Sequence, residues 1–137
     1  MVRLLALLAV AGSLLLVSSA GAAAPRYIMV TGPGISKPIL LADWSENMAI
    51  ETELLLAPKA ERPRGLSSRS RLTLSLYWGW GQARPQSPGQ ANQRGWLYPA
   101  ADGRPPVIAL RVNGRSPLRV VTGRLLRILQ RHAVPTG

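Results

Sequence analysis

The stretch "RLTLSLYWGWG", residues 71–81, decides the fold because apolar and polar side chains alternate along it. Thr73, Ser75 and Tyr77 occupy the positions between the apolar residues. Successive side chains of a β-strand point to opposite faces, so this pattern predicts a strand with one buried face. The predicted buried set consists of Leu72, Leu74, Leu76, Trp78 and Trp80.

The two tryptophans of this strand also fit a binding site. Trp78 and Trp80 would lie about 7 Å apart on one strand face, where flat indoles can stack on consecutive sugar rings. They would then form a ligand-stacking site for a glycan or a peptide. The alternative is that both continue the leucine face into the core. We favour the core because the chain has no phenylalanine to fill it.

The residues before this strand predict two strands joined by a turn and followed by a helix. Residues 26–32, "RYIMVTG", are rich in strand-forming residues, and an apolar run resumes at residues 37–42. The intervening "TGPGISKP" contains a lysine after two glycines, but it matches neither G-x-x-x-x-G-K-[ST] nor G-x-G-x-x-G. We interpret it as a turn. Asp43 and Glu46 have capping-box spacing, so a helix is expected over "WSENMAIETELLL", ending at Pro58.

Two loops and a last strand are expected in the second half of the chain. Residues 58–71 form a basic loop rich in helix breakers, and residues 81–95 form a mobile loop rich in proline and glutamine. "VIALRVNGRSP" predicts the final strand. Its Asn113-Gly114 dipeptide often makes a tight hairpin turn. We interpret it as a link from strand to helix because a helical pattern follows.

That pattern is "SPLRVVTGRLLRILQRHAVP", residues 116–135, with Ser116-Pro117 as a suitable start. Gly123 could restrict the helix to its second half. The apolar side and His132 fall on one face, and Arg124, Arg127 and Arg131 fall on the other as a possible anion-binding surface. Such a helix either docks on the sheet or lies on an anionic membrane. We favour docking. The apolar row is Leu118, Val121, Leu125, Ile128 and Leu129.

The elements together predict a small α+β domain with about four or five strands, one helix after the second strand and an amphipathic C-terminal helix. Residues 1–22 have the features of a signal peptide, with an apolar run ending in the small residues Ala20-Gly21-Ala22. An uncleaved membrane anchor is the minority interpretation. Residues 23–137 are then a single secreted or extracytoplasmic domain. It has no cysteine and therefore no disulfide.

The basic residues are concentrated in the second half of the chain. Residues 59–137 contain fourteen arginine and lysine side chains and only two acidic ones, Glu61 and Asp102. Such a surface attracts polyanions. The candidate partners are anionic lipid and wall polymer, with a glycan as the alternative and nucleic acid disfavoured. The same excess also fits a GC-rich codon usage, because fifteen of the seventeen basic residues are arginine.

Residues for catalysis are scarce. His132 is the only histidine, and a Ser-His-Asp set would have to combine it with Asp102 and one of Ser67, Ser68 or Ser70, whose spacing does not suggest it. Zinc would need more ligands than the chain supplies. Glu46, Glu51 and Glu53 are interpreted as ordinary charge on a solvated helix face. We therefore expect no catalytic residues, no cofactor and no metal, and a small hydrolase is the least favoured function.

Three pieces of the chain resemble an uncharacterised group of small exported bacterial proteins. They are "YIMVTGPGISKPILL", "RLTLSLYWG" and "WLYPAADGRPP", which contain the patterns G-P-G-x-x-x-P-I and L-Y-P-x-A-x-G-x-P. The resemblance implies an extracytoplasmic location and a shared architecture, and it implies no activity. The expectation is a non-catalytic secreted or envelope-associated protein that binds an anionic envelope component through its arginine-rich C-terminal half.

Overall fold

The structure is a computed structural model that describes residues 24–137, so the predicted signal peptide lies outside the described residues. The fold is α+β, as predicted, with six strands where four or five were expected. The elements are β1 (Tyr27–Thr31), β2 (Ile39–Leu41), α2 (Trp44–Leu56), the short 3-10 helix η1 (Leu66–Ser68), β3 (Leu72–Tyr77), β4 (Gln93–Tyr98), β5 (Val107–Leu110), β6 (Leu118–Val120) and α3 (Gly123–Arg131).

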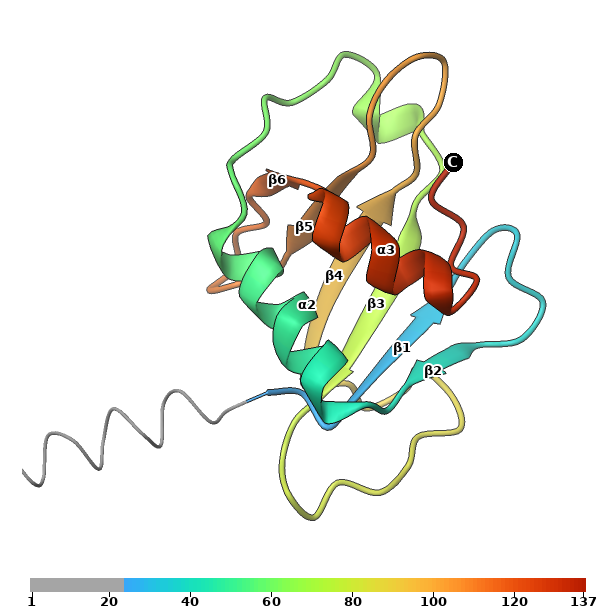
Figure 1. The fold of residues 1–137 in the computed structure, drawn as a ribbon, viewed down its shortest axis with the longest axis vertical. Helices are drawn as coiled ribbons and strands as arrows, with labels where there is room; N and C mark the ends of the chain where they lie inside the picture. The colour runs from blue at the N-terminus through green and yellow to red at the C-terminus, as the bar shows by residue number, and fades with distance from the viewer. Residues whose placement is uncertain (1–23) are drawn as a thin grey trace, which may run out of the picture.

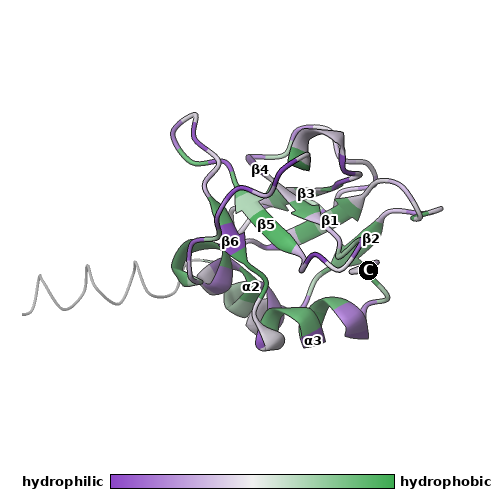
Figure 2. Cartoon of the chain, turned by 90° about the horizontal axis from the view of Figure 1, so that it is seen from above, coloured by the Kyte–Doolittle hydropathy of each residue, from purple (hydrophilic) through white to green (hydrophobic). Residues whose placement is uncertain are grey.

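The six strands form one antiparallel sheet in the order β2-β1-β3-β4-β5-β6. Both helices lie against the same face of this sheet (Figures 1 and 2). We call this side the helix face. The opposite side, which loops, the short helix η1 and long side chains cover, is the loop face.

The helix face is the main core. The register pairs Val30 with Leu74 and Leu72 with Leu97, so the predicted leucine row of β3 lies among apolar residues of its neighbours. α3 adds Leu125, which is fully buried, and α2 adds Ile50. Burial of such side chains is the main favourable contribution to folding. The prediction that the leucines of residues 72–76 face the core is confirmed.

The "TGPGISKP" segment is the turn between β1 and β2, as predicted. Ile35 N–H donates to the Gly32 carbonyl at 3.1 Å, and Gly34 has a φ of 83°. Gly32 has a φ of 140° and packs so closely against β3 that a Cβ there would lie 3.0 Å from Leu72. Glycine is required there for both reasons.

α2 begins as the sequence predicts and is anchored by a buried amide. The Asp43 carboxylate accepts a hydrogen bond of 2.8 Å from Glu46 N–H. One turn later the buried Asn47 side chain donates to the carbonyls of Pro25 (3.2 Å), Arg26 (3.2 Å) and Leu41 (3.1 Å). This single side chain therefore joins α2 to the segment before β1 and to the last residue of β2.

The expectation for residues 116–135 was wrong in its first third. Residues 118–120 form β6, and Asn113-Gly114 makes the hairpin that joins β5 to β6, with φ values of 51° and 75°. Pairing with β5 satisfies backbone groups that a helix start at Ser116 would leave exposed. The helix starts instead at Gly123, where the Thr122 hydroxyl accepts from Leu125 N–H at 3.3 Å.

The loop expected over residues 81–95 ends earlier than predicted, because β4 begins at Gln93. The loop that remains packs on the loop face. There Tyr77 donates its hydroxyl proton to the carbonyls of Ser87 or Gly89, at 2.9 and 3.0 Å. The basic loop 58–71 covers the other end of this face, where Leu66 is buried against Tyr98.

Candidate anion-binding surfaces

Charge is distributed unevenly between the two faces of the molecule. Four of the six acidic side chains lie on α2 or at its cap: Asp43, Glu46, Glu51 and Glu53. Residues 24–137 contain sixteen arginine and lysine side chains, and among them only Arg131 forms an ion pair with a carboxylate. Most of the positive charge is therefore uncompensated within the described chain.

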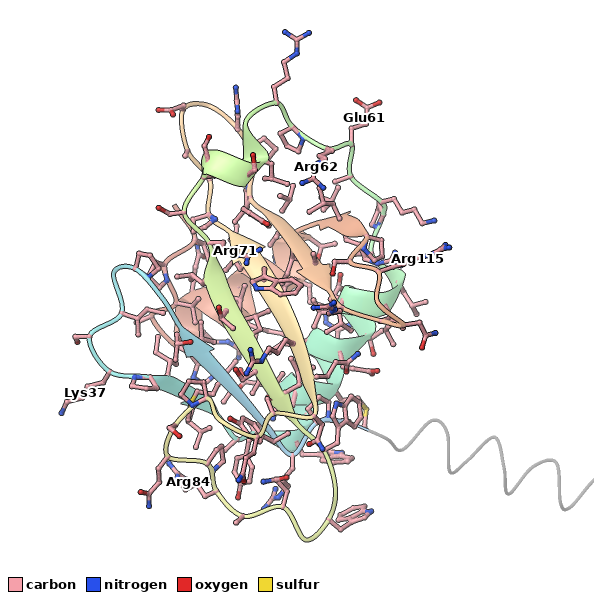
Figure 3. The ribbon with its side chains drawn as sticks, turned by 180° about the vertical axis from the view of Figure 1, so that it is seen from behind. Lys37, Glu61, Arg62, Arg71, Arg84 and Arg115 are labelled. Atoms are coloured by element: carbon pink, nitrogen blue, oxygen red, sulfur yellow. The ribbon has the colours of Figure 1, made fainter. Side chains whose placement is uncertain are left out.

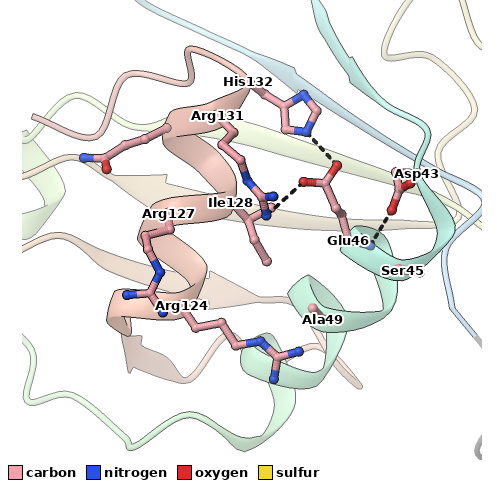
Figure 4. A pocket seen from close by; sticks show the side chains of 10 residues that line it. Asp43, Ser45, Glu46, Ala49, Arg124, Arg127, Ile128, Arg131 and His132 are labelled. Atoms are coloured by element: carbon pink, nitrogen blue, oxygen red, sulfur yellow. Dashed lines mark hydrogen bonds and ion pairs between the residues drawn. The ribbon is translucent and has the colours of Figure 1, made fainter.

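A groove of about 1130 Å³ lies between α2 and α3, and Glu46 is the central charge in it (Figure 4). Its carboxylate lies 3.2 Å from Arg131 Nη2 and 2.8 Å from His132 Nε2. The sequence interpretation of Glu46 as ordinary solvated charge was wrong, since its side chain is only 18% exposed. The Glu46 carboxylate is partly buried because two nitrogen atoms at the C-terminal end of α3 lie against it.

A second α2 carboxylate contacts the other end of α3. Glu53 accepts a hydrogen bond of 2.8 Å from the hydroxyl of Thr122, the residue that caps α3. Glu46 and Glu53 therefore hold the two ends of α3. Glu51 is different, because partial burial raises the pKa of its carboxyl without a basic partner to offset the cost.

The predicted anion surface of α3 lies where the sequence places it. Arg124, Arg127 and Arg131 are exposed, while Leu125 and Leu129 are buried, so the docked arrangement of the helix is the one observed. Glu46 compensates Arg131, however, and the same groove is lined by Asp43. The surface therefore combines two unpaired arginines with an acidic end.

The residues considered for catalysis do not come together. Ser68, Ser70 and Asp102 line a depression of about 580 Å³ whose lining does not include His132. Ser67 is exposed in η1. Within residues 24–137, no three histidine or acidic side chains are grouped as metal ligands would be.

The two tryptophans proposed as a stacking site do not share a surface. β3 ends at Tyr77, and the indole of the half-buried Trp78 donates to Gln93 Oε1 at 3.2 Å. Gly79 then turns the chain with a φ of 109°, and Trp80 is 88% exposed. Trp80 stacks on Trp44 with centroids 5.5 Å apart. The prediction that Trp80 is buried was wrong, because the strand does not extend to it.

The loop face holds a group of arginines that sequence reasoning missed. The Arg71 guanidinium carbon lies 4.8 Å from the centre of the Trp96 ring, and its Nη1 lies 3.4 Å from the Tyr98 hydroxyl. A depression of about 320 Å³ adjoins this pair, lined also by Arg62 and Arg111. Figure 3 views this face, with Arg62 and Arg71 labelled. We call the depression the Trp96 pocket.

The Trp96 pocket differs from the α2–α3 groove in its charge. Its lining contains three arginines and no carboxylate, whereas Asp43 and Glu46 line the groove. Further positive charge lies nearby. Arg94 lies in β4, the strand that holds Trp96, and lines a neighbouring depression together with Arg111. Burial raises the pKa of the Tyr77 phenol, and Arg94 opposes that rise.

The signal for this pocket was present in "QRGWLY", residues 93–98. Arg94, Trp96 and Tyr98 occupy alternate positions of one strand. Alternation places them on one face. The polar residues before Gly95 hid the pattern, because they extended the expected loop into the strand.

No family model matches this chain, and no curated protein or solved structure matches it at a significant level. Neither helix within residues 24–137 is long and apolar enough to cross a membrane.

Proposed function

We propose that this is an exported, non-catalytic protein that binds an anionic component of the cell envelope through the arginines of its C-terminal half. The observation that carries the proposal is the Trp96 pocket, whose lining within residues 24–137 contains three arginines and no carboxylate. Unpaired guanidinium groups attract anions and bind carboxylate or phosphate through two parallel N–H bonds. The partner is an anionic lipid or an anionic wall polymer.

The loop face supports this function better than α3 does. On α3, Glu46 holds Arg131, and Asp43 adds a second negative charge to the groove. An approaching polyanion would meet like charge there. Arg124 and Arg127 add to the general attraction, but the arginines around Trp96 form the principal contact.

Binding to phosphatidylglycerol vesicles and to a soluble polyuronate, each measured over a range of salt concentrations, tests the proposal. We expect affinity for at least one of them to fall steeply between 50 and 300 mM salt (about an order of magnitude), because exposed charges are screened. Neutral phosphatidylcholine vesicles and a neutral dextran serve as controls. Equal binding to charged and neutral partners, or no dependence on salt, would contradict the proposal.

A second candidate function is contact with a neutral glycan or a peptide through Trp80. The 88% exposure of this indole favours it, because tryptophan is enriched at binding interfaces, where an exposed ring face is available to a partner. One face of Trp80 stacks on Trp44 and supports the ring. If this function holds, Trp80→Ala abolishes oligosaccharide binding at any salt concentration, and Arg111→Gln leaves it intact.

A further inference from the structure

The Trp96 pocket has a shape set by the register of three strands. Trp96 pairs with Ala109 across β4 and β5, and Ala109 pairs with Leu118 across β5 and β6. The small Ala109 side chain lies between two large ones and leaves a hollow on the loop face. The hollow of about 320 Å³ is at the lower limit of ordinary ligand pockets, so it suits one ring rather than an extended chain.

Arg71 forms one wall of the pocket and lies over the Trp96 ring. Its stack on Trp96 holds the planar guanidinium over the indole, and its Nη1 lies near the Tyr98 hydroxyl at a weak 3.4 Å. Among the described residues this guanidinium has no other hydrogen-bond partner and no ion pair. A guanidinium has five N–H donors, so most of those of Arg71 remain available to a ligand.

The rest of the lining is mixed. Arg62 comes from the basic loop and Arg111 follows β5, and both side chains are exposed. Ser116 and Tyr98 contribute hydroxyl groups. The apolar part consists of the indole, Leu66, Leu118 and the Ala109 floor. A ligand that satisfies all of these groups is hydroxylated, carries negative charge and has an apolar face.

We propose that the Trp96 pocket binds one acidic sugar unit, a pyranose ring that carries a carboxylate or a phosphate. The C–H face of the ring packs on the indole edge and Leu118. The arginines hold the acid group, and the hydroxyl groups of Ser116 and Tyr98 meet those of the sugar. This inference rests on the proposed function and names the chemical class of the anion.

Two simpler ligands fit the lining less well. An inorganic anion would use the arginines and leave the indole without a contact. An aromatic acid would use the indole and the arginines but leave the two hydroxyl groups facing an apolar ring, and unpaired polar groups in a site disfavour such a ligand. The sugar acid is the class that uses every group.

Calorimetric titration of the exported protein with five small probes tests the inference. Glucuronate and glucose 6-phosphate should bind at least about tenfold more tightly than glucose, inorganic phosphate and benzoate, because only they make both charged and ring contacts. The titrations are done at 50 mM salt and repeated at 300 mM. Equal binding of phosphate and glucose 6-phosphate would overturn the proposal in favour of a plain anion site. Preference for benzoate would overturn it in favour of an aromatic acid.

Three variants locate the binding. Arg111→Gln should weaken glucuronate binding about tenfold by removing a charged donor, whereas the matched variant Arg124→Gln on α3 should not change it. Arg71→Lys keeps the charge but not the flat fork, so it should lose glucuronate binding while salt-dependent binding of the polyanion is retained. Undiminished glucuronate binding by both Arg111→Gln and Arg71→Lys would exclude this pocket.

Failure of this inference can be told apart from failure of the proposed function. If the polyanion binds with steep salt dependence and no sugar acid binds or competes, the inference is wrong and the proposed function stands. If neither the polyanion nor the vesicles bind in a salt-dependent way, the proposed function fails, and the inference fails with it. Melting temperatures of all variants, measured in parallel, confirm that each is folded.

Discussion

The two faces of the sheet are built from the same strands but are covered in different ways. Two helices close the helix face, and α2 carboxylates hold both ends of α3. On the loop face, loops cover the ends, and arginine side chains lie across the middle, one of them stacked on Trp96. Acidic residues of one face hold α3 in place, while the arginines around Trp96 on the other face form no ion pair with a carboxylate of the described residues. The helix face maintains the fold, and this difference supports our proposal that the loop face meets the ligand.

We expect the largest loss of stability from a substitution at Leu125, which is fully buried on the helix face. Leu125→Asp buries an unpaired charge and should cost more than about 4 kcal/mol, enough to unfold the domain. Arg124→Asp, one residue away and exposed, should leave the melting temperature nearly unchanged. Circular dichroism melting checks both. A folded Leu125→Asp protein would mean that α3 is not part of the core.

We expect the next largest loss of stability from substitution of Asn47. Asn47→Ala leaves the carbonyls of Pro25, Arg26 and Leu41 without their common donor and should destabilise the domain by about 2–3 kcal/mol. Urea unfolding measures the change. Asn47→Asp, which also lacks the amide donor but keeps the shape, should be at least as unstable. If Asn47→Ala unfolds at the wild-type urea concentration, these bonds do not anchor α2.

Substitutions at Trp78 and Trp80 test where the core ends and the surface begins. Trp78→Ala should cost about 2 kcal/mol, less than a fully buried indole, because the side chain is half-buried and packs against the core. Trp80→Ala should change stability by less than about 0.5 kcal/mol, since Trp80 is exposed. Thermal melting of the two variants compares them. Equal losses would show that Trp80 belongs to the core after all.

Glu51 gives the smallest effect, and its sign follows from its pKa. Burial raises the pKa of this carboxyl in the folded state, so folding favours the protonated form, and stability falls as pH rises through the raised pKa. Glu51→Gln should therefore stabilise the protein at pH 7 by less than about 0.5 kcal/mol, since the group is only partly buried. The gain should vanish at pH 3. A gain that persists there would point to another cause.

Local patterns predicted much of the helix face. The leucine alternation of residues 72–76, the Asp43 cap and the buried row around Leu125 each depend on neighbours in sequence, and each was found. The errors arose where distant residues compete. Helical periodicity continues back to Leu118, but three residues there pair with β5 instead. The Glu46 side chain contacts His132, which lies 86 residues away, instead of the Asp43 N–H that a capping box would pair with it.

The loop face could not be predicted in the same way. Arg71 and Trp96 meet only because β3 and β4 pair in one register, across a loop whose length gives no such information. The hollow at Ala109 likewise depends on which residues of β4 and β6 lie beside it. Composition indicated that arginines are in excess. The tertiary fold determines which of them remain unpaired.

We propose that the loop face, rather than α3, meets the anion. Two matched variants test it most directly: Arg62→Gln with Arg111→Gln on the loop face, and Arg124→Gln with Arg127→Gln on α3. Each removes two exposed charges. We measure polyuronate and vesicle affinity against salt concentration for both and for the wild type. We expect the loop-face variant to lose most of the salt-sensitive affinity and the α3 variant to keep it. The opposite result would contradict the proposal and would show that the anion binds at α3.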